Sequence, residues 1–113
     1  MTFHKDVLRI DSMAVTEELV ANLKRDVRQT LRRSGAVVGI SGGLDSSVVL
    51  ALCVRAFGPK RVLGVMMPEK DSSDDSLVLA RQLADQFGVE SVVEYMTDAL
   101  AGFGCYTRRD EAI

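Results

Sequence analysis

The sequence predicts an α/β protein built on a parallel sheet. Two unbroken apolar runs rich in valine and isoleucine, Ala36–Ile40 and Val62–Met67, have the length and composition of strands that are covered on both faces. A helical pattern, Ser46–Phe57, lies between them, and further helical patterns precede and follow the pair. Because alternating helices and strands pack as layers, we expect residues 1–113 to form a single three-layer α/β/α domain.

Composition and charge narrow the class of protein. An apolar fraction of 47% with 27% charged residues is typical of a globular domain. Fourteen basic and sixteen acidic residues give a charge of −2, which provides no field for gathering nucleic acid. No apolar run approaches the roughly 18 residues of a membrane span. Two cysteines, Cys53 and Cys105, without a CxxC pair favour the reducing cytoplasm.

The first helix is predicted to begin near Val15 and to end before Gly35. Acidic residues in its first turn and arginines in its last turn suit the helix dipole. Its expected inner stripe recurs at every fourth position: Leu19, Leu23, Val27 and Leu31.

The next helix, Ser46–Phe57, is apolar on nearly every side, and we expect it to be buried. Gly58 and Pro59 end it. The strand Val62–Met67 follows and stops at Pro68, which completes a strand, helix and strand unit with an expected right-handed crossover.

The rest of the chain predicts one more helix and one more strand before the pattern weakens. The helix has an inner stripe that runs from Leu77 to Phe87, and Ser91–Tyr95 reads as a third strand. Residues 98–104 predict a short turn or helix. Arg108–Ile113 resembles the first turn of another helix, so we expect the fold to be incomplete at its carboxyl end.

The loop after the first strand carries the chemistry. Adjacent glycines, Gly42 and Gly43, allow successive N–H groups to turn inward as an anion-binding nest, and the start of a helix adds its positive end. Serine hydroxyls at positions 41, 46 and 47 add donors. Asp45 is negative, so its expected task is to bind a Mg²⁺ ion that bridges phosphate oxygens. The sequence therefore predicts a polyphosphate site.

An alternative is a plain strand-to-helix turn with Asp45 or Ser46 as N-cap. Against it, the full pattern SGGxDS is expected by chance in a chain of this length on the order of once in ten thousand. The Walker pattern GxxxxGK[ST] is absent from the sequence, and no lysine follows the glycines, which disfavours simple transfer of the γ-phosphoryl group.

The segment Val38–Ser47 resembles the signature of the ATP pyrophosphatase (PP-loop) superfamily, which cleaves ATP between its α- and β-phosphates. Within it, the chain is most similar to ammonia-type NAD synthetases, through Gly39–Gly43, Val62–Pro68, and the two serines Ser73 and Ser76. The resemblance implies a Rossmann-like, adenine nucleotide alpha hydrolase-like fold. It also implies these ATP-binding residues, with Asp45 as a magnesium ligand: Gly39, Ile40, Ser41, Gly42, Gly43, Leu44, Asp45, Ser46 and Ser47.

The reaction implied is amidation of deamido-NAD by ammonia, with ATP as the energy source, Mg²⁺ as the metal, and a possible homodimer as the assembly. No protein nucleophile is required. In the family, a second magnesium carboxylate and most deamido-NAD contacts belong to a carboxyl-terminal half outside this sequence. Two alternatives stay open: another PP-loop enzyme that forms amides or thiols on a nucleotide or tRNA, and a non-catalytic binder of adenine nucleotides.

Other polar residues are expected to have ordinary roles. The charged loop from Glu69 to Asp75 reads as solvated, although Lys70 could reach a phosphate. Arg108 and Arg109 are explained equally well by a charged helix start and by a substrate phosphate. Met66 and Met67 could pack beside adenine or in the core.

Overall fold

A computed structural model describes residues 3–113 and contains a parallel sheet of three strands. The strands are β1 (Ala36–Gly39), β2 (Val62–Met66) and β3 (Glu90–Val93), in the order β1-β2-β3. Val38 pairs with Gly64, which in turn pairs with Ser91. The predicted parallel α/β class is confirmed.

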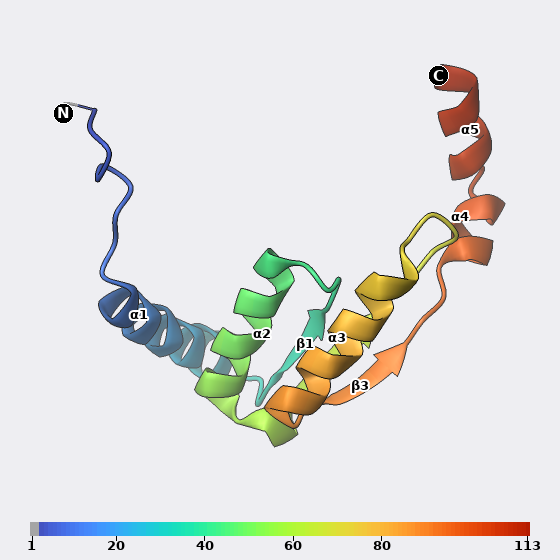
Figure 1. Ribbon diagram of the computed structural model, residues 1–113. Helices are drawn as coiled ribbons and strands as arrows, with labels where there is room; N and C mark the ends of the chain where they lie inside the picture. Colours follow the sequence, from blue (N-terminus) through green and yellow to red (C-terminus); the bar gives the residue numbers. More distant parts are fainter. Residues whose placement is uncertain (1–2) are drawn as a thin grey trace.

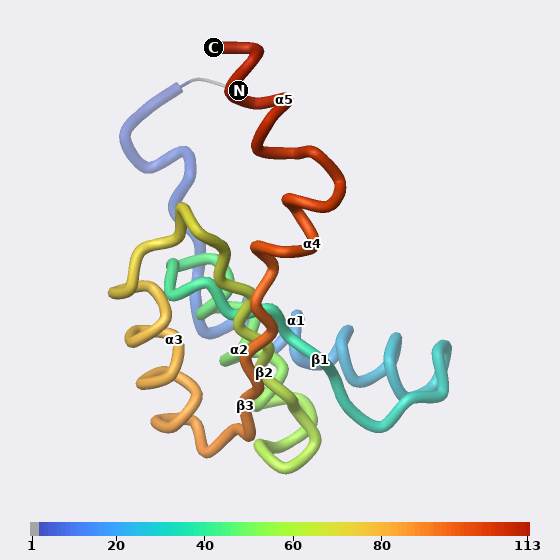
Figure 2. The backbone as a smooth tube through the Cα atoms, turned by 90° about the vertical axis from the view of Figure 1, so that its right-hand side faces the viewer, coloured from blue at the N-terminus to red at the C-terminus, as the bar shows by residue number. Residues whose placement is uncertain are grey.

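Helices connect and flank the strands. They are α1 (Ser12–Lys24) with a π-helical continuation η1 (Arg25–Thr30), α2 (Leu44–Phe57), the 3₁₀ turn η2 (Pro59–Arg61), α3 (Asp74–Phe87), α4 (Thr97–Gly102) and α5 (Cys105–Ala112). Figure 1 shows α2 and α3 on one face of the sheet, with α1 beside α2. The view in Figure 2 shows α4 and α5 standing clear of the sheet, beyond the carboxyl ends of its strands.

The core lies between the sheet and the two helices α2 and α3. Alternation along β1 turns Val38 and then Ile40 toward these helices, where they are 5% and 4% exposed. Leu50 of α2 is fully buried. Cys53 lies in the same core, and burial raises the pKa of its thiol. No helix among residues 3–113 combines the length and apolar character that crossing a bilayer requires.

The opposite face of the sheet departs from the expectation of strands covered on both sides. Val37 is 71% exposed there, and Val92 of β3 is 37% exposed. The reason is topological: strands added in one direction with right-handed crossovers place both connecting helices on the same face. Residues 3–113 therefore form two of the three expected layers, which are the sheet and one layer of helices.

Two helices bury a narrower surface than the sequence indicated. In α1 and η1 the residues packed on the core are Val20, Leu23 and Val27, whereas Leu19 is 42% exposed. A strict four-residue step drifts around a helix of 3.6 residues per turn, so the stripe moves to neighbouring positions. The expectation that the helix Ser46–Phe57 is buried all round was wrong, since Val48 is 49% and Val49 48% exposed.

Candidate functional site

The loop predicted to bind phosphate connects β1 to α2 at the carboxyl edge of the sheet. Its first residue, Ile40, is anchored in the core, and its backbone N–H donates to the carbonyl of Val65 at 2.8 Å. Gly42 has φ +84°, and a Cβ atom there would lie 2.6 Å from the carbonyl oxygen of Ser76 on α3. Both facts require glycine at position 42, since other residues rarely adopt this φ and have no room.

Serine hydroxyls organise the interior of the loop. The N–H of Ser41 donates to Oγ of Ser46 at 3.1 Å, and the N–H of Gly43 donates to Oγ of Ser41 at 3.2 Å. The two hydroxyl oxygens are 3.0 Å apart. Ser41 and Ser46 thus hold the loop curled, with two of its N–H groups donating to serine hydroxyls, and the predicted anion-binding nest stays a prediction.

The third predicted hydroxyl, that of Ser47, is turned to the backbone. It donates to the carbonyl of Gly43 at 2.6 Å. This contact ties the first turn of α2 to the loop, so Ser47 stabilises the turn and its proton is already engaged.

The amino end of α2 supplies unpaired donors. Gly43 is the N-cap residue, and no side chain among residues 3–113 caps this end. The first N–H groups of a helix have no acceptor within the helix, and they carry the positive end of its dipole. The N–H groups of Leu44, Asp45 and Ser46 are therefore placed to bind an anion. The side chain of Leu44 is 78% exposed, so only the backbone N–H of this residue contributes to the amino end of α2.

Asp45 lies in this first turn with an exposed side chain. Within the described chain, residues 3–113, no three His, Cys, Asp or Glu side chains gather into a metal site. Magnesium is commonly held by one or two carboxylates together with phosphate oxygens and water. A single exposed carboxylate beside a phosphate loop fits that donor set.

A pocket of about 170 Å³ opens beside the loop, where β1 and β2 end. Ligands commonly bind at the carboxyl ends of parallel strands. Met66 is buried at 2% exposure and Met67 is 53% exposed, and both line the pocket. The full lining is Ile40, Ser41, Met66, Met67, Pro68, Ser72, Ser73, Ser76, Leu77 and Ala80.

Two serines fix the rim of this pocket on α3. Ser73 is the N-cap of α3, and its Oγ accepts the N–H of Ser76 at 3.1 Å. The hydroxyl oxygens of Ser73 and Ser76 are 2.7 Å apart. The carbonyl of Ser76 faces Gly42, so the rim and the phosphate loop are in contact.

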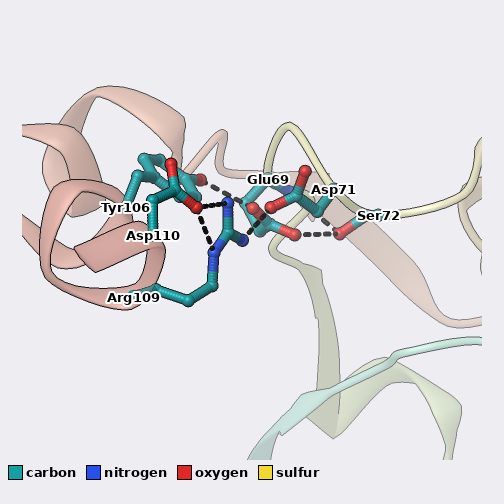
Figure 3. A network of polar contacts seen from close by, with 6 residues as sticks. All are labelled: Glu69, Asp71, Ser72, Tyr106, Arg109 and Asp110. Atoms are coloured by element: carbon teal, nitrogen blue, oxygen red, sulfur yellow. Dashed lines mark hydrogen bonds and ion pairs between the residues drawn. The ribbon is translucent and has the colours of Figure 1, made fainter. Parts of the chain in front are cut away.

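The loop that follows β2 is exposed from residue 70 to residue 75, as predicted, and three of its side chains also contact α5 (Figure 3). Tyr106 of α5 donates its hydroxyl proton to Oε2 of Glu69 at 2.6 Å, and Arg109 of α5 pairs with Asp71. Lys70 places Nζ 3.9 Å from the centre of the Tyr106 ring. The expectation of a charged helix start for Arg108 and Arg109 changes, since both lie inside α5 (Cys105–Ala112).

These contacts shift the titration of the carboxyl groups. The hydrogen bond from Tyr106 holds the pKa of Glu69 below its usual value, and the hydrogen bond from Arg109 does the same for Asp71. Desolvation, aided by Glu69, raises the pKa of Tyr106. The partners are separated by 37 and 38 residues, and no motif or spacing in the sequence links them.

The nine predicted site residues, 39–47, form one continuous stretch from the end of β1 through the loop to the first turn of α2. A parallel α/β sheet with this loop after its first strand defines a Rossmann-like protein of the PP-loop class. The NAD synthase family model matches residues 15–111, and the chain belongs to that family.

Individual relatives agree. The chain is 50% identical over 107 residues to the "NH(3)-dependent NAD(+) synthetase" of Mesorhizobium japonicum, which covers 95% of this chain and 34% of the relative. The chain therefore spans about a third of the length of the curated relative that it matches.

Two solved structures share the fold. One is the NH3-dependent NAD synthetase from Campylobacter jejuni in complex with the nitrate ion, with TM-score 0.75, 29% identity, and coverage of 83% of this chain and 40% of that one. The other is a glutamine-dependent NAD+ synthetase from Acinetobacter baumannii in complex with ADP, with TM-score 0.76, 31% identity, and coverage of 86% and 18%.

Proposed function

We propose that this chain provides the ATP-binding part of an ammonia-dependent NAD synthetase. The observation that carries the proposal is the curled loop from Ser41 to Ser46, which brings serine hydroxyls and the uncapped amino end of α2 together at the carboxyl edge of the sheet. Membership of the NAD synthase family, together with a relative named as an NH(3)-dependent NAD(+) synthetase, supports the choice of reaction.

In this proposal the phosphates and the nucleoside of ATP bind at two neighbouring parts of the site. The loop N–H groups bind the β- and γ-phosphates, where their donors face the negative oxygens. The neighbouring pocket, with the thioether of Met67 and the hydroxyls of Ser72 and Ser73, receives the nucleoside. This places the α-phosphorus between the two, open to attack by an acceptor.

In the proposed reaction a carboxylate oxygen of deamido-NAD attacks the α-phosphorus, and the bond to the bridging oxygen breaks to release pyrophosphate. Ammonia then displaces AMP from the acyl carbon and loses a proton, which leaves the amide of NAD. Catalysis in such chemistry comes from positioning and from neutralising charge. Asp45 would hold Mg²⁺, which supplies charge neutralisation at the departing pyrophosphate.

Subunit pairing and location belong to the same proposal. Exposed apolar side chains on α2, at Val48 and Val49, give a surface on which two copies could pair as a homodimer. Two free cysteines, Cys53 and Cys105, fit a reducing cytoplasm. Analytical ultracentrifugation over a concentration series tests the pairing.

The reaction is tested by incubating the protein with ATP, Mg²⁺, deamido-NAD and ammonium. Release of pyrophosphate together with NAD supports the proposal. Pyrophosphate released only with a different acceptor would point to another PP-loop enzyme. ATP that binds without turnover would restrict the function of this chain to nucleotide binding.

A further inference from the structure

Helices α4 and α5 form an arm, residues 97–112, that lies beyond the strand ends (Figures 1 and 2). Two backbone hydrogen bonds lead into it: the N–H of Glu94 donates to Met66 at 2.8 Å, and the N–H of Met96 donates to Pro68 at 2.9 Å. These bonds extend the β2–β3 pairing to the point where the loop 69–72 begins. The arm is thus held beside that loop from its first residue.

The arm then contacts three successive loop residues. Figure 3 shows Glu69 accepting the hydroxyl proton of Tyr106, and Asp71 paired with Arg109. Between them in the chain, Lys70 lies over the ring of Tyr106. We call these five residues the polar clip. The loop closes on itself next to the clip, where the N–H of Glu69 donates to Oγ of Ser72 at 3.1 Å.

The clip ends where the pocket begins. Ser72 lines the pocket and is bonded to Glu69 of the clip, and the next residue, Ser73, caps α3 on the same rim. The position of the loop therefore determines the shape of the pocket mouth. A loop of polar residues without such contacts would sample many conformations, and a ligand would have to order it on binding.

We propose that Tyr106 and Arg109 are positioning residues that hold the loop 69–72 in the form that receives the nucleoside part of ATP. This inference rests on the proposed function, in which the pocket takes the nucleoside and the loop Ser41–Ser46 takes the phosphates. The arm acts only through the loop, since the clip residues are outside the lining of the pocket.

Direct binding of phosphate by the clip cations is less consistent with the contacts. Arg109 is already paired with Asp71 and with Asp110, whose Oδ1 is 3.2 Å from its Nη2. Lys70 is held over the Tyr106 ring. Binding a phosphate through either cation would break the contacts that order the loop, so we assign the clip to positioning.

The test is calorimetric titration of the 113-residue chain with two probes, Mg²⁺-ATP and Mg²⁺-pyrophosphate. In Tyr106→Phe the hydrogen bond to Glu69 is lost while the ring stays. We expect ATP to bind roughly three- to tenfold more weakly, which matches the net contribution of one typical hydrogen bond. Pyrophosphate, which lacks a nucleoside, should bind as in the wild type. Arg109→Gln should show the same selectivity, and Arg109→Lys should restore part of the ATP affinity.

Tyr95→Phe is the matched control, because Tyr95 is 71% exposed and lies outside the clip. Circular dichroism of each variant checks that the fold is retained. A double variant, Asp71→Arg with Arg109→Asp, should recover ATP affinity relative to either single change, because the pair is restored with its charges exchanged.

The outcomes separate the two proposals. Wild-type protein that binds neither probe refutes the proposed function, and the positioning role with it. Wild-type protein that binds both probes, with Tyr106→Phe unchanged toward ATP, refutes the positioning role alone. An equal loss of both probes in Tyr106→Phe also refutes it, because a general loss of structure would then explain the result.

Discussion

The backbone of Gly42 in the phosphate loop touches the carbonyl of Ser76 in the first turn of α3, so closely that a Cβ atom on residue 42 would lie 2.6 Å from that oxygen. The contact joins the loop after β1 to the helix that borders the neighbouring pocket. Because both surfaces are backbone, neither can yield as the end of a flexible side chain would. The two halves of the candidate site therefore have a fixed spacing.

Replacing Gly42 with alanine should destabilise the protein by about 1–3 kcal/mol, through the strain of a positive φ and the contact with Ser76. Urea denaturation followed by circular dichroism measures the loss. Gly102→Ala is the control, because a Cβ there meets nothing within 4 Å and lies in helix α4. Equal stability of the Gly42→Ala variant and the wild type would contradict the close contact.

Asp45→Asn should weaken the binding of ATP about tenfold in the presence of Mg²⁺, since one carboxylate ligand is lost. Without Mg²⁺ the same change should leave ATP binding equal or tighter, because a negative charge beside the phosphates is removed. Isothermal titration with and without the metal measures both. Asp85→Asn, at the far end of α3, is the control. If Asp45→Asn weakened ATP binding to the same extent without Mg²⁺, a role of Asp45 as metal ligand would be excluded.

Leu50→Ala should cost about 2–5 kcal/mol of unfolding free energy, because Leu50 is fully buried and its truncation leaves a cavity. Val78→Ala on α3 is the comparison, with a side chain that is 53% exposed and a much smaller expected effect. Thermal and urea unfolding measure both. Similar losses for the two variants would place the core elsewhere.

The polar clip should weaken in acid. The folded-state pKa values of Glu69 and Asp71 lie below their usual values, so their contribution is fully present above the ordinary carboxylate range, near pH 4, and is lost as pH falls through the lowered values. Carbon-13 NMR of the carboxyl groups follows this titration. In Tyr106→Phe the pKa of Glu69 should rise toward normal while that of Asp71 stays low. An unchanged Glu69 titration would show that the hydrogen bond is absent in solution.

Local patterns predicted the strands and the phosphate loop because their causes are local. The runs Ala36–Ile40 and Val62–Met67 contain the observed β1 and β2, and the glycines and serines between them place the curled loop where the sequence indicated. The roles of residues 39–47 in binding ATP and of Asp45 in binding metal remain predictions.

Features that depend on tertiary contacts could not be predicted from local sequence patterns. The pairing of Glu69 with Tyr106 joins residues 37 positions apart, and each residue alone looks like ordinary surface. The exposure of Val48 and Val49 depends on which neighbouring elements pack against α2, and hydrophobicity alone does not record this. The uncovered face at Val37 follows from strand order rather than from strand composition.

The uncovered face of the sheet is a place where the protein surface can be modified. Val37 and Val92 point away from α2, α3 and the candidate site, so their surface chemistry can be altered without entering the pocket. Polar replacements such as Val37→Thr keep the preference for an extended backbone while reducing contact with other molecules in concentrated solution. Preparations improved in this way would suit crystallisation and NMR, with the residues of the candidate site unchanged.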